Sequence, residues 1–406
     1  MKWKTIVLIL IFSLNSCLIQ KITGAFQGEP EDLEKNISIG AKKLIENAFE
    51  GIDSSRLTDF HTHINGINTG KTGCFVNKKM RSFWHIKEYL RFKVYLSALG
   101  VKDDENADRK AVERLVRLIR NIKGHGKYQI LAFDKHYRKD GSVDMDNTEF
   151  YCPNFYAYKL AEEFPDVFIP AISVHPYRKD ALDELEKWGK KGVRLVKWLP
   201  NAQGINPSDP DIEPFYEMMK KYKMILLTHA GEEKAVDADD AQKLGNPLLL
   251  RKPLDMGVKV IVAHCASLGQ NEDLDDPLKT KRDNFDLFLR LMDEKKYVGL
   301  LFGETSAQVQ FNRLSKPIAT MMQRKDLLHR LVNGSDYPLP AVNLIIRTSK
   351  LVEKGFITME ERKYLNEIYN YNPLLFDFVV KRTIKHPETK EKLPAEMFHY
   401  NKGLDY

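Results

Sequence analysis

Six side chains able to bind a divalent metal each end a short apolar run of this chain: His61, His63, Lys197, His229, His264 and Asp336. The last four are separated by 32, 35 and 72 residues. Because a strand followed by a helix takes roughly 30 residues or more, these gaps correspond to one, one and two such units. Imidazoles and carboxylates are ligands of Zn²⁺ and similar ions. The spacing therefore predicts a metal site at the strand ends of a β/α barrel.

The candidate ligands are expected on the inward faces of their strands. Side chains alternate along a strand with a period of two, so His61 and His63 project to one side. The same alternation groups Val193 and Leu195 with Lys197, Ile225 and Leu227 with His229, Val260 and Val262 with His264, and Val332 and Gly334 with Asp336. Catalytic groups of such barrels lie at the C-terminal ends of strands, where all of these candidates are placed.

Apolar runs typical of strands that helices cover predict eight strands. They span 57–63, 128–133, 168–175, 192–198, 224–229, 259–264, 297–302 and 332–336. Helical patterns lie between them at 181–190, 213–222, 283–294 and 341–354. We therefore expect an α/β fold, a (β/α)8 TIM barrel.

Two further helical regions are expected outside the repeating unit. The stretch 65–127 holds helical patterns at 83–99 and 105–122. As an insertion after strand one it would overhang the top of the barrel, where substrate selectivity usually resides. A C-terminal helical segment at 359–385 is expected to pack against the outside of the barrel.

Length and composition predict one catalytic domain. The chain has 406 residues, of which 43% are hydrophobic and 29% charged, enough for a single large core. No linker or low-complexity tract is evident, so we assign the domain to 50–385 and a C-terminal tail to 386–406. The formal net charge of +7 falls to +5 when residues 1–16, with their two lysines, are removed. Both signs are interspersed along the chain, and nucleic-acid binding is not expected.

The N-terminal residues 1–25 are predicted to be a signal and tether rather than part of the fold. Two lysines precede the apolar run 5–14, which is too short for a comfortable membrane span. Residues 14–17 resemble a bacterial lipobox, in which Cys17 would become a lipidated membrane anchor, although Asn15 is uncommon there. We expect an exported lipoprotein at the cell envelope. Cleavage near 23–25, giving a free periplasmic or secreted protein, and a retained anchor are the alternatives.

Three cysteines besides Cys17 remain, at Cys74, Cys152 and Cys265. Their number is odd and their spacing does not match a metal finger. Cys265 directly follows a candidate ligand and is expected to point away from the barrel interior as a buried thiol.

From about residue 57 to residue 371 the chain resembles the amidohydrolase superfamily, specifically its amidohydrolase-2 branch of metal-dependent hydrolases and decarboxylases. The resemblance rests on Asp59-Phe-His-Thr-His63, Gly192-Val-Arg-Leu-Val-Lys197, Leu227-Thr-His-Ala-Gly231, Val262-Ala-His-Cys265 and Asn333-Gly-Ser-Asp-Tyr-Pro338. These motifs in this order are highly specific as a set.

The resemblance implies roles for the candidate residues. His61, His63 and Asp336 would hold a first divalent metal, expected to be Zn²⁺, and His229 would join it or bind a second ion with His264. In two-metal members a carboxylated lysine at the end of strand four bridges the ions, and Lys197 matches that position. Lys197 could instead pair with a substrate carboxylate or be structural. Asp336 and His264 are the expected catalytic residues, with Asp336 taking the proton of the attacking water.

The expected activity is hydrolysis of a C–N, C–O or ester-type bond of a small molecule by metal-activated water. One alternative is a one-metal decarboxylase of the same branch, and another is a lipoprotein that binds metal or ligand without turnover. Homo-oligomerisation is left open. Near the strand ends lie weaker candidates that we do not count as catalytic: His175, Glu232, Glu233, Glu304, Arg313 and Tyr337.

Overall fold

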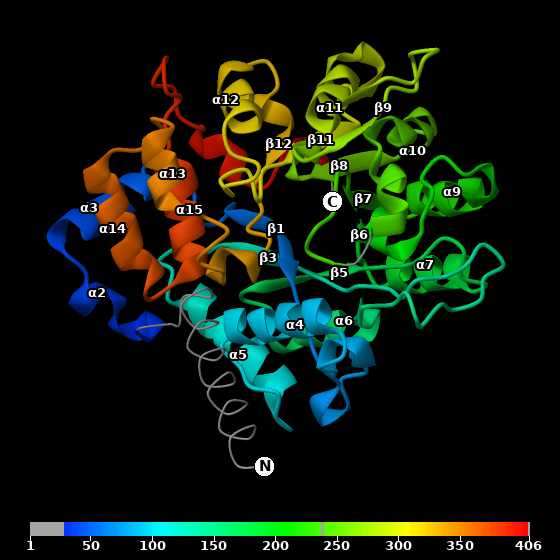
Figure 1. The fold of residues 1–406 in the computed structure, drawn as a ribbon, viewed down its shortest axis with the longest axis horizontal. Helices are drawn as coiled ribbons and strands as arrows, with labels where there is room; N and C mark the ends of the chain where they lie inside the picture. Colours follow the sequence, from blue (N-terminus) through cyan, green and yellow to red (C-terminus); the bar gives the residue numbers. More distant parts are fainter. Residues whose placement is uncertain (1–27, 237–238, 405–406) are drawn as a thin grey trace, which may run out of the picture.

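Eight parallel strands form the centre of the fold, and helices ring them (Figure 1). The computed structural model describes residues 28–236 and 239–404, so the predicted leader 1–25, with Cys17, lies outside the described residues. The strands are β1 Thr58–His63, β3 Lys127–Leu131, β5 Phe168–Ile172, β6 Leu195–Trp198, β7 Ile225–His229, β8 Lys259–Ala263, β11 Leu301–Glu304 and β12 Leu331–Val332. Neighbours in the sheet follow this order, each pair parallel.

The sheet closes on itself between its first and last strands. The backbone N–H of Phe60 donates to the carbonyl of Asn333 at 2.9 Å, and that of His63 donates to the carbonyl of Tyr337 at 2.9 Å. The N–H of Asp336 donates to the carbonyl of His61 at 2.7 Å. The predicted (β/α)8 barrel is therefore confirmed, and its closure brings the His61 and Asp336 segments side by side.

The interior of the barrel is filled by side chains from alternating strand positions, as the period of two requires. They are Phe60, Leu131, Ala171, Leu195, Ile225, Leu227, Ile261, Ala263, Phe302 and Val332, joined by Leu404 from the C-terminus. The predicted inward positions of Leu195, Ile225 and Leu227 are confirmed, whereas that of Val193 is wrong, because Val193 precedes β6 and packs in the outer hydrophobic layer.

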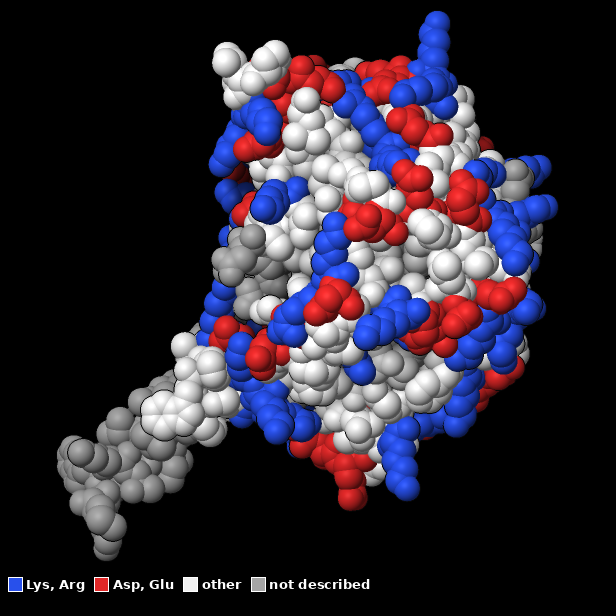
Figure 2. All heavy atoms as spheres, turned by 90° about the vertical axis from the view of Figure 1, so that its right-hand side faces the viewer, with Lys and Arg blue, Asp and Glu red and all other residues white. Residues whose placement is uncertain are grey.

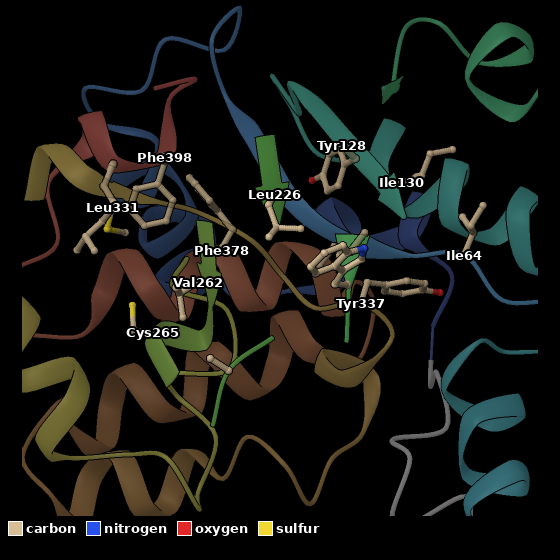
Figure 3. Packing of buried hydrophobic residues seen from close by; sticks show 14 of the residues in the cluster. Ile64, Tyr128, Ile130, Leu226, Val262, Cys265, Leu331, Tyr337, Phe378 and Phe398 are labelled. Carbon is tan, nitrogen blue, oxygen red and sulfur yellow. The ribbon is translucent and has the colours of Figure 1, made fainter. Parts of the chain in front are cut away.

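The predicted inward face of β8 is wrong. Ile261 and Ala263 lie in the barrel interior, whereas Val260 and Val262 pack with the surrounding helices. Cys265 lies in that same outer layer, as predicted, and Figure 3 shows it beside Val262 among the buried hydrophobic side chains. His264 escapes the alternation because its own φ is +56°, which turns the chain as the strand ends.

Helices cover the outside of the barrel as the β/α repeat requires. They are α6 Asn154–Glu163, α7 Ala181–Lys190, α8 Pro200–Gln203, α9 Glu213–Lys221, α10 Arg251–Asp255, α11 Asn284–Asp293, α12 Lys316–Gln323 and α13 Thr348–Glu353. The helix predicted at 341–354 begins only at Thr348. Residues 342–347 are not helical, and two of them, Val342 and Ile345, line a cavity at the C-terminal ends of the strands.

The predicted insertion after β1 is present, and its residues Arg91, Val94 and Tyr95 line the cavity at that end of the barrel. It contains α4 Ile86–Ala98 and α5 Ala107–Arg120, close to the predicted limits. A short strand within it, β2 Phe75–Val76, pairs antiparallel with β4 Phe150–Tyr151, which follows β3.

The C-terminal segment predicted at 359–385 forms two helices, α14 Met359–Tyr369 and α15 Pro373–Thr383. The break falls at Asn372, whose side chain accepts from the N–H groups of Leu374 and Leu375 at 3.1 Å and so caps α15. Proline at the first position of α15 fits a helix start.

Segments on both sides of the assigned limits 50–385 pack on this unit. The N-terminal helices are α2 Leu33–Asn36 and α3 Ile39–Phe49, and the Phe49 ring lies 4.6 Å from that of Phe378 on α15. Within 386–404, Met397 and Phe398 are buried, and Tyr400 donates its N–H to the carbonyl of Arg56.

The described part of the chain contains no helix that is both long and apolar enough to cross a membrane. On the face shown in Figure 2, lysine and arginine side chains are interleaved with aspartate and glutamate.

Candidate metal centre

Three predicted ligands converge at the C-terminal ends of β1 and β12. His61 Nε2 lies 3.1 Å from His63 Nε2 and 3.5 Å from Asp336 Oδ1, and His63 Nε2 lies 3.3 Å from the same oxygen. Ligand atoms held about 2.0–2.1 Å from a tetrahedral ion are roughly 3.3 Å apart. The three atoms therefore have the spacing that one divalent ion requires.

Strand β1 presents both histidines because its register shifts between Asp59 and Thr62. Asp59 is buried, and its Oδ1 accepts from the N–H groups of His61 at 2.8 Å and Ser335 at 3.0 Å. One carboxylate thus ties the histidine strand to the segment that carries Asp336. The φ of Asp336 is +59°, a strained conformation for this residue that the surrounding bonds must maintain.

A lysine of helix α15 bonds to the segment that carries Asp336. The buried ammonium of Lys381 donates to the carbonyl of Gly334 at 2.5 Å and to Asp377 Oδ2 at 2.6 Å. Burial raises the pKa of Asp377 to about 6, although the Lys381 charge opposes this. Sequence periodicity places α15 on the outside of the barrel but gives no sign that its lysine reaches a strand end.

Glu304, at the end of β11, contacts both His61 and His264. The sequence analysis names it only as a weak candidate and does not count it as catalytic. Its Oε2 lies 3.0 Å from His61 Nδ1, accepts from Ser306 Oγ at 2.6 Å, and lies 3.3 Å from the N–H of His264. A metal on Nε2 of His61 leaves the proton on Nδ1, which then donates to Glu304. Burial raises the pKa of Glu304 to about 7.

The predicted end of the seventh strand explains why the sequence analysis does not select Glu304. The predicted strand ends at Phe302, whereas β11 runs from Leu301 to Glu304. Gly303 and Glu304 end β11, and a carboxylate at the C-terminal end of a strand lies on the catalytic face of a barrel. This position is the sequence signal from which Glu304 could have been selected.

His264 and His229 lie beside the first three ligands. His264 Nδ1 is 2.8 Å from Ser306 Oγ, and its Nε2 is 3.8 Å from Asp336 Oδ2. His229 Nδ1 is 3.4 Å from Glu233 Oε2, and its ring centroid is 5.3 Å from that of His264. Burial lowers the pKa of both imidazoles, that of His229 to about 4, which favours the neutral ligand form.

Lys197 ends β6 with its Nζ 3.2 Å from His61 Nε2. No carboxylate oxygen of residues 28–236 or 241–404 forms an ion pair with this amine, which is only 2% exposed. Burial lowers the pKa of Lys197 to about 8, although the charges of Asp336, Glu304 and Glu233 oppose the shift. At pH 7 a pKa of about 8 leaves about a tenth of the Lys197 amine neutral, far more than for an ordinary lysine.

The residues present fit a divalent metal. Neutral imidazole nitrogens and a carboxylate form a donor set suited to Zn²⁺ and similar ions. His229 Nε2 is buried and has no hydrogen-bond partner in the described part of the chain, as expected of a nitrogen that is reserved for a ligand. Within that part, two ligand groups are close enough to share an ion, and both contain His61: one with His63 and Asp336, the other with His264 and Glu304.

A cavity of about 330 Å³ opens above this centre. Its floor contains all six predicted site residues, and its roof includes Tyr95 of α4. Phe133 and Phe150 line one wall, and Arg313 lines another. A larger hollow of about 610 Å³ lies at the other end of the barrel, near Phe168 and Arg194. That hollow is at the N-terminal ends of strands, away from the catalytic face.

Arg313 is buried in the wall of the cavity with no carboxylate within ion-pair distance among the described residues. Its guanidinium donates to Ser267 Oγ at 3.2 Å, and its Nε has no partner in the described chain. A buried, incompletely bonded guanidinium facing a cavity is suited to receive an anionic group.

The other weak candidates have structural or positioning contacts. His175 is buried with Nε2 2.8 Å from the carbonyl of Gln203, and burial lowers its pKa to about 3. Glu233 faces His229, whereas Glu232 forms a 3.3 Å ion pair with Lys234 at the rim. Tyr337 is fully buried in the hydrophobic layer shown in Figure 3 and is not part of the cavity wall.

A comparison with family models gives a match to the amidohydrolase family over residues 125–358, more than half of the 406-residue chain. The chain belongs to the amidohydrolase family. The matched region contains Lys197, His229, His264 and Asp336. Members of this metal-dependent family include hydrolases, hydratases and decarboxylases that act on small molecules. The family and its superfamily consist of enzymes, and candidate metal ligands are present in this amidohydrolase.

Solved structures similar to this amidohydrolase have low sequence identity to it. An uncharacterized TIM-barrel protein from Bordetella bronchiseptica is 14% identical, with 76% of this chain and 94% of that chain covered and a TM-score of 0.46. 4-Oxalomesaconate hydratase from Rhodopseudomonas palustris is 16% identical (76% and 92% covered, TM-score 0.40). 5-Carboxyvanillate decarboxylase from Sphingomonas paucimobilis is 10% identical (77% and 92% covered, TM-score 0.41). No curated protein sequence matches the chain.

Proposed function

We propose that this amidohydrolase uses a divalent metal, Zn²⁺ or a similar ion, to hydrolyse a C–N, C–O or ester-type bond of a small molecule. The observation that carries the proposal is the convergence of His61 Nε2, His63 Nε2 and Asp336 Oδ1 within 3.5 Å of one another on the floor of a cavity. A bound divalent ion supplies Lewis acidity, which acidifies water and polarises a substrate oxygen.

The protein groups then have separate tasks. Asp336 uses Oδ1 in the ligand group, while its Oδ2 faces His264 Nε2 at 3.8 Å. Oδ2 is thus placed to take a proton from water and return it to the leaving group. His264 is kept in place by Ser306 and the Glu304 carboxylate, and its neutral Nε2 can orient the water or the substrate oxygen.

We also propose that Lys197 carries a carbamate in the metal-loaded enzyme. A charged ammonium 3.2 Å from the ligand atom of His61 would repel a divalent ion. The neutral amine avoids this repulsion, and it is the form that takes up carbon dioxide. Two ions per chain are then expected, with His229 and His264 contributing to the second.

Native mass spectrometry tests the carbamate. We expect an increase of about 44 Da that bicarbonate promotes and Lys197→Arg abolishes, since a guanidinium stays charged. Metal analysis giving one ion and no added mass would assign Lys197 to a substrate or structural role.

Decarboxylation is the second candidate, and Arg313 is the observation that favours it. A buried guanidinium facing the cavity without a carboxylate partner would hold the carboxylate of an acidic substrate near the metal. Such a group is equally suited to a hydrolase with an acidic substrate, so product analysis is required to separate the two reactions.

A substrate panel of amides, lactones, esters and aromatic carboxylates, run with Zn²⁺, Mn²⁺ or Ni²⁺, tests both reactions. Hydrolysis places ¹⁸O from labelled water in the organic product, whereas decarboxylation releases carbon dioxide and leaves the organic product without this label. His63→Ala and chelator-treated enzyme are the controls. Stoichiometric metal binding without turnover across the panel would favour a non-catalytic binding protein.

We further propose export by the leader 1–25 and lipid anchoring at Cys17. The support is the Lys-flanked apolar run and the lipobox-like sequence before Cys17. Fractionation of cells that produce the full chain is expected to find it in the membrane, and Cys17→Ser is expected to prevent lipidation. A protein unchanged by this substitution would contradict anchoring.

A further inference from the structure

Two buried cysteines face each other across the short antiparallel ladder beneath the roof of the active site. Phe75 of β2 is paired with Tyr151 of β4, and Val76 with Phe150. Continuing this register by one residue places Cys74 directly opposite Cys152. The Cys74 and Cys152 thiols are 3.6 Å apart, and the two residues are only 2% and 3% exposed.

The ladder geometry makes this pair suitable for a covalent link. The N–H and C=O groups of Cys152 both bond to Phe133, at 2.8 and 2.9 Å, and therefore point away from Cys74. Cys74 and Cys152 thus form a non-hydrogen-bonded pair, in which Cα atoms are about 4.5 Å apart and side chains approach most closely. Disulfides join residues whose Cα atoms are about 4.4–6.8 Å apart.

We propose that Cys74 and Cys152 are a disulfide site that staples the roof of the cavity to the barrel. A thiolate of one cysteine attacks a small-molecule disulfide such as oxidised glutathione, releasing one glutathione thiolate and forming a mixed disulfide. The second cysteine thiolate displaces the other glutathione. The two protein thiols lose two protons and two electrons in total, and the oxidised glutathione is reduced to two thiols.

The position of the link relates it to the active site. It would close a loop of 78 residues that contains α4, α5 and β3. Tyr95 of α4 lines the cavity, as do Phe150, two residues from Cys152, and Phe133, bonded to Cys152. The disulfide would therefore limit movement of the roof relative to these walls.

Burial determines when the link can form. Oxidants do not reach the thiols while β2 and β4 stay paired, and burial raises the pKa of Cys152 well above its usual range. Oxidation is expected during folding, or when the ladder opens, and the finished disulfide would be equally shielded from reductants. The inference does not depend on the proposed hydrolysis.

The test uses the full chain, refolded in mixtures of reduced and oxidised glutathione and then alkylated in denaturant. A non-reducing peptide map is expected to show one link, between the peptides containing Cys74 and Cys152. Cys265→Ala is the control for a third buried cysteine and should leave this link unchanged. Cys74→Ser and Cys152→Ser should each abolish it.

Thermal unfolding of the wild-type chain gives an independent measurement. The oxidised form should unfold about 3 to 5 °C above the reduced form. The inference is overturned if both cysteines are alkylated or glutathionylated at every glutathione ratio in folded wild-type protein. It is also overturned if the link forms but lowers the unfolding temperature, because strain would then exclude a stabilising staple.

Discussion

Replacing Glu304 by glutamine tests whether this buried carboxylate maintains the metal centre. Every group near its two oxygens is a donor: His61 Nδ1–H, Ser306 Oγ–H, and the N–H groups of Ser306 and His264. The amide NH₂ of glutamine must face at least one of these donors, whichever way it is turned. The isosteric change therefore removes charge and creates a donor–donor conflict without making a cavity.

The magnitude follows from the bonds involved. A hydrogen bond to a charged group contributes about 1.5–3 kcal/mol, and loss of a carboxylate behind a metal-binding histidine typically weakens metal affinity about 10- to 100-fold. These ranges agree, because a factor of 100 corresponds to about 2.7 kcal/mol. We expect Glu304→Gln to weaken Zn²⁺ binding by about 10- to 100-fold.

Competition with a chromophoric chelator measures this affinity, and circular dichroism checks the fold. Glu184→Gln is a matched control, since Glu184 accepts from Trp188 Nε1 at 2.8 Å on α7, outside the cavity. Equal affinity of Glu304→Gln and wild-type protein, with both folded, would refute the assignment of Glu304 as the group that orients His61.

Three further predictions concern the groups that support or face the site. Lys381→Met should lower the free energy of unfolding by about 3–5 kcal/mol in urea titrations, because it leaves Asp377 buried without its cation. The double variant Asp377→Leu with Lys381→Met should recover most of this loss. A double variant as unstable as Lys381→Met alone would argue against a stabilising role of the Lys381–Asp377 ion pair. Since the pKa of Asp377 is raised to about 6, the native protein retains a proton that the unfolded chain releases near pH 4. As the pH rises from about 4 to 6, the free energy of unfolding should therefore fall by up to about 1.4 kcal/mol per pH unit. Asp377→Asn should remove this contribution, and an equal pH dependence of the free energy of unfolding in the wild type and in Asp377→Asn would contradict the raised pKa. Arg313→Met should raise KM for carboxylate substrates about 10- to 100-fold, from loss of a charged hydrogen bond, with little change for neutral esters; equal effects on both would refute the anion-binding role.

Much of the barrel is predictable from the sequence because the ligand spacing follows the length of the β/α unit and strand alternation is a local property. Lys197 and His229 share a face with inward Leu195 and Leu227, whereas in β1 the inward residue is Phe60 and the register shift between Asp59 and Thr62 presents His61 and His63. The same reasoning fails at β8, where the interior positions are Ile261 and Ala263. A left-handed turn at His264, which alternation cannot foresee, returns its imidazole to the site.

The supporting contacts are not predictable because they join distant segments. Lys381 on α15 meets Gly334 only after the barrel closes, and Glu304 meets His61 across 243 residues of sequence. Helical periodicity at 341–354 likewise gives no sign that Val342 and Ile345 are held out of a helix at the cavity wall. These features depend on tertiary packing, which overrides local propensity.

The most direct test of the central claim is anomalous X-ray diffraction from crystals of the zinc-loaded protein, recorded on both sides of the zinc edge. We expect a peak about 2.0–2.2 Å from His61 Nε2, His63 Nε2 and an Asp336 carboxylate oxygen. An ion bound away from these three side chains, or no ion at saturating zinc, would contradict the account.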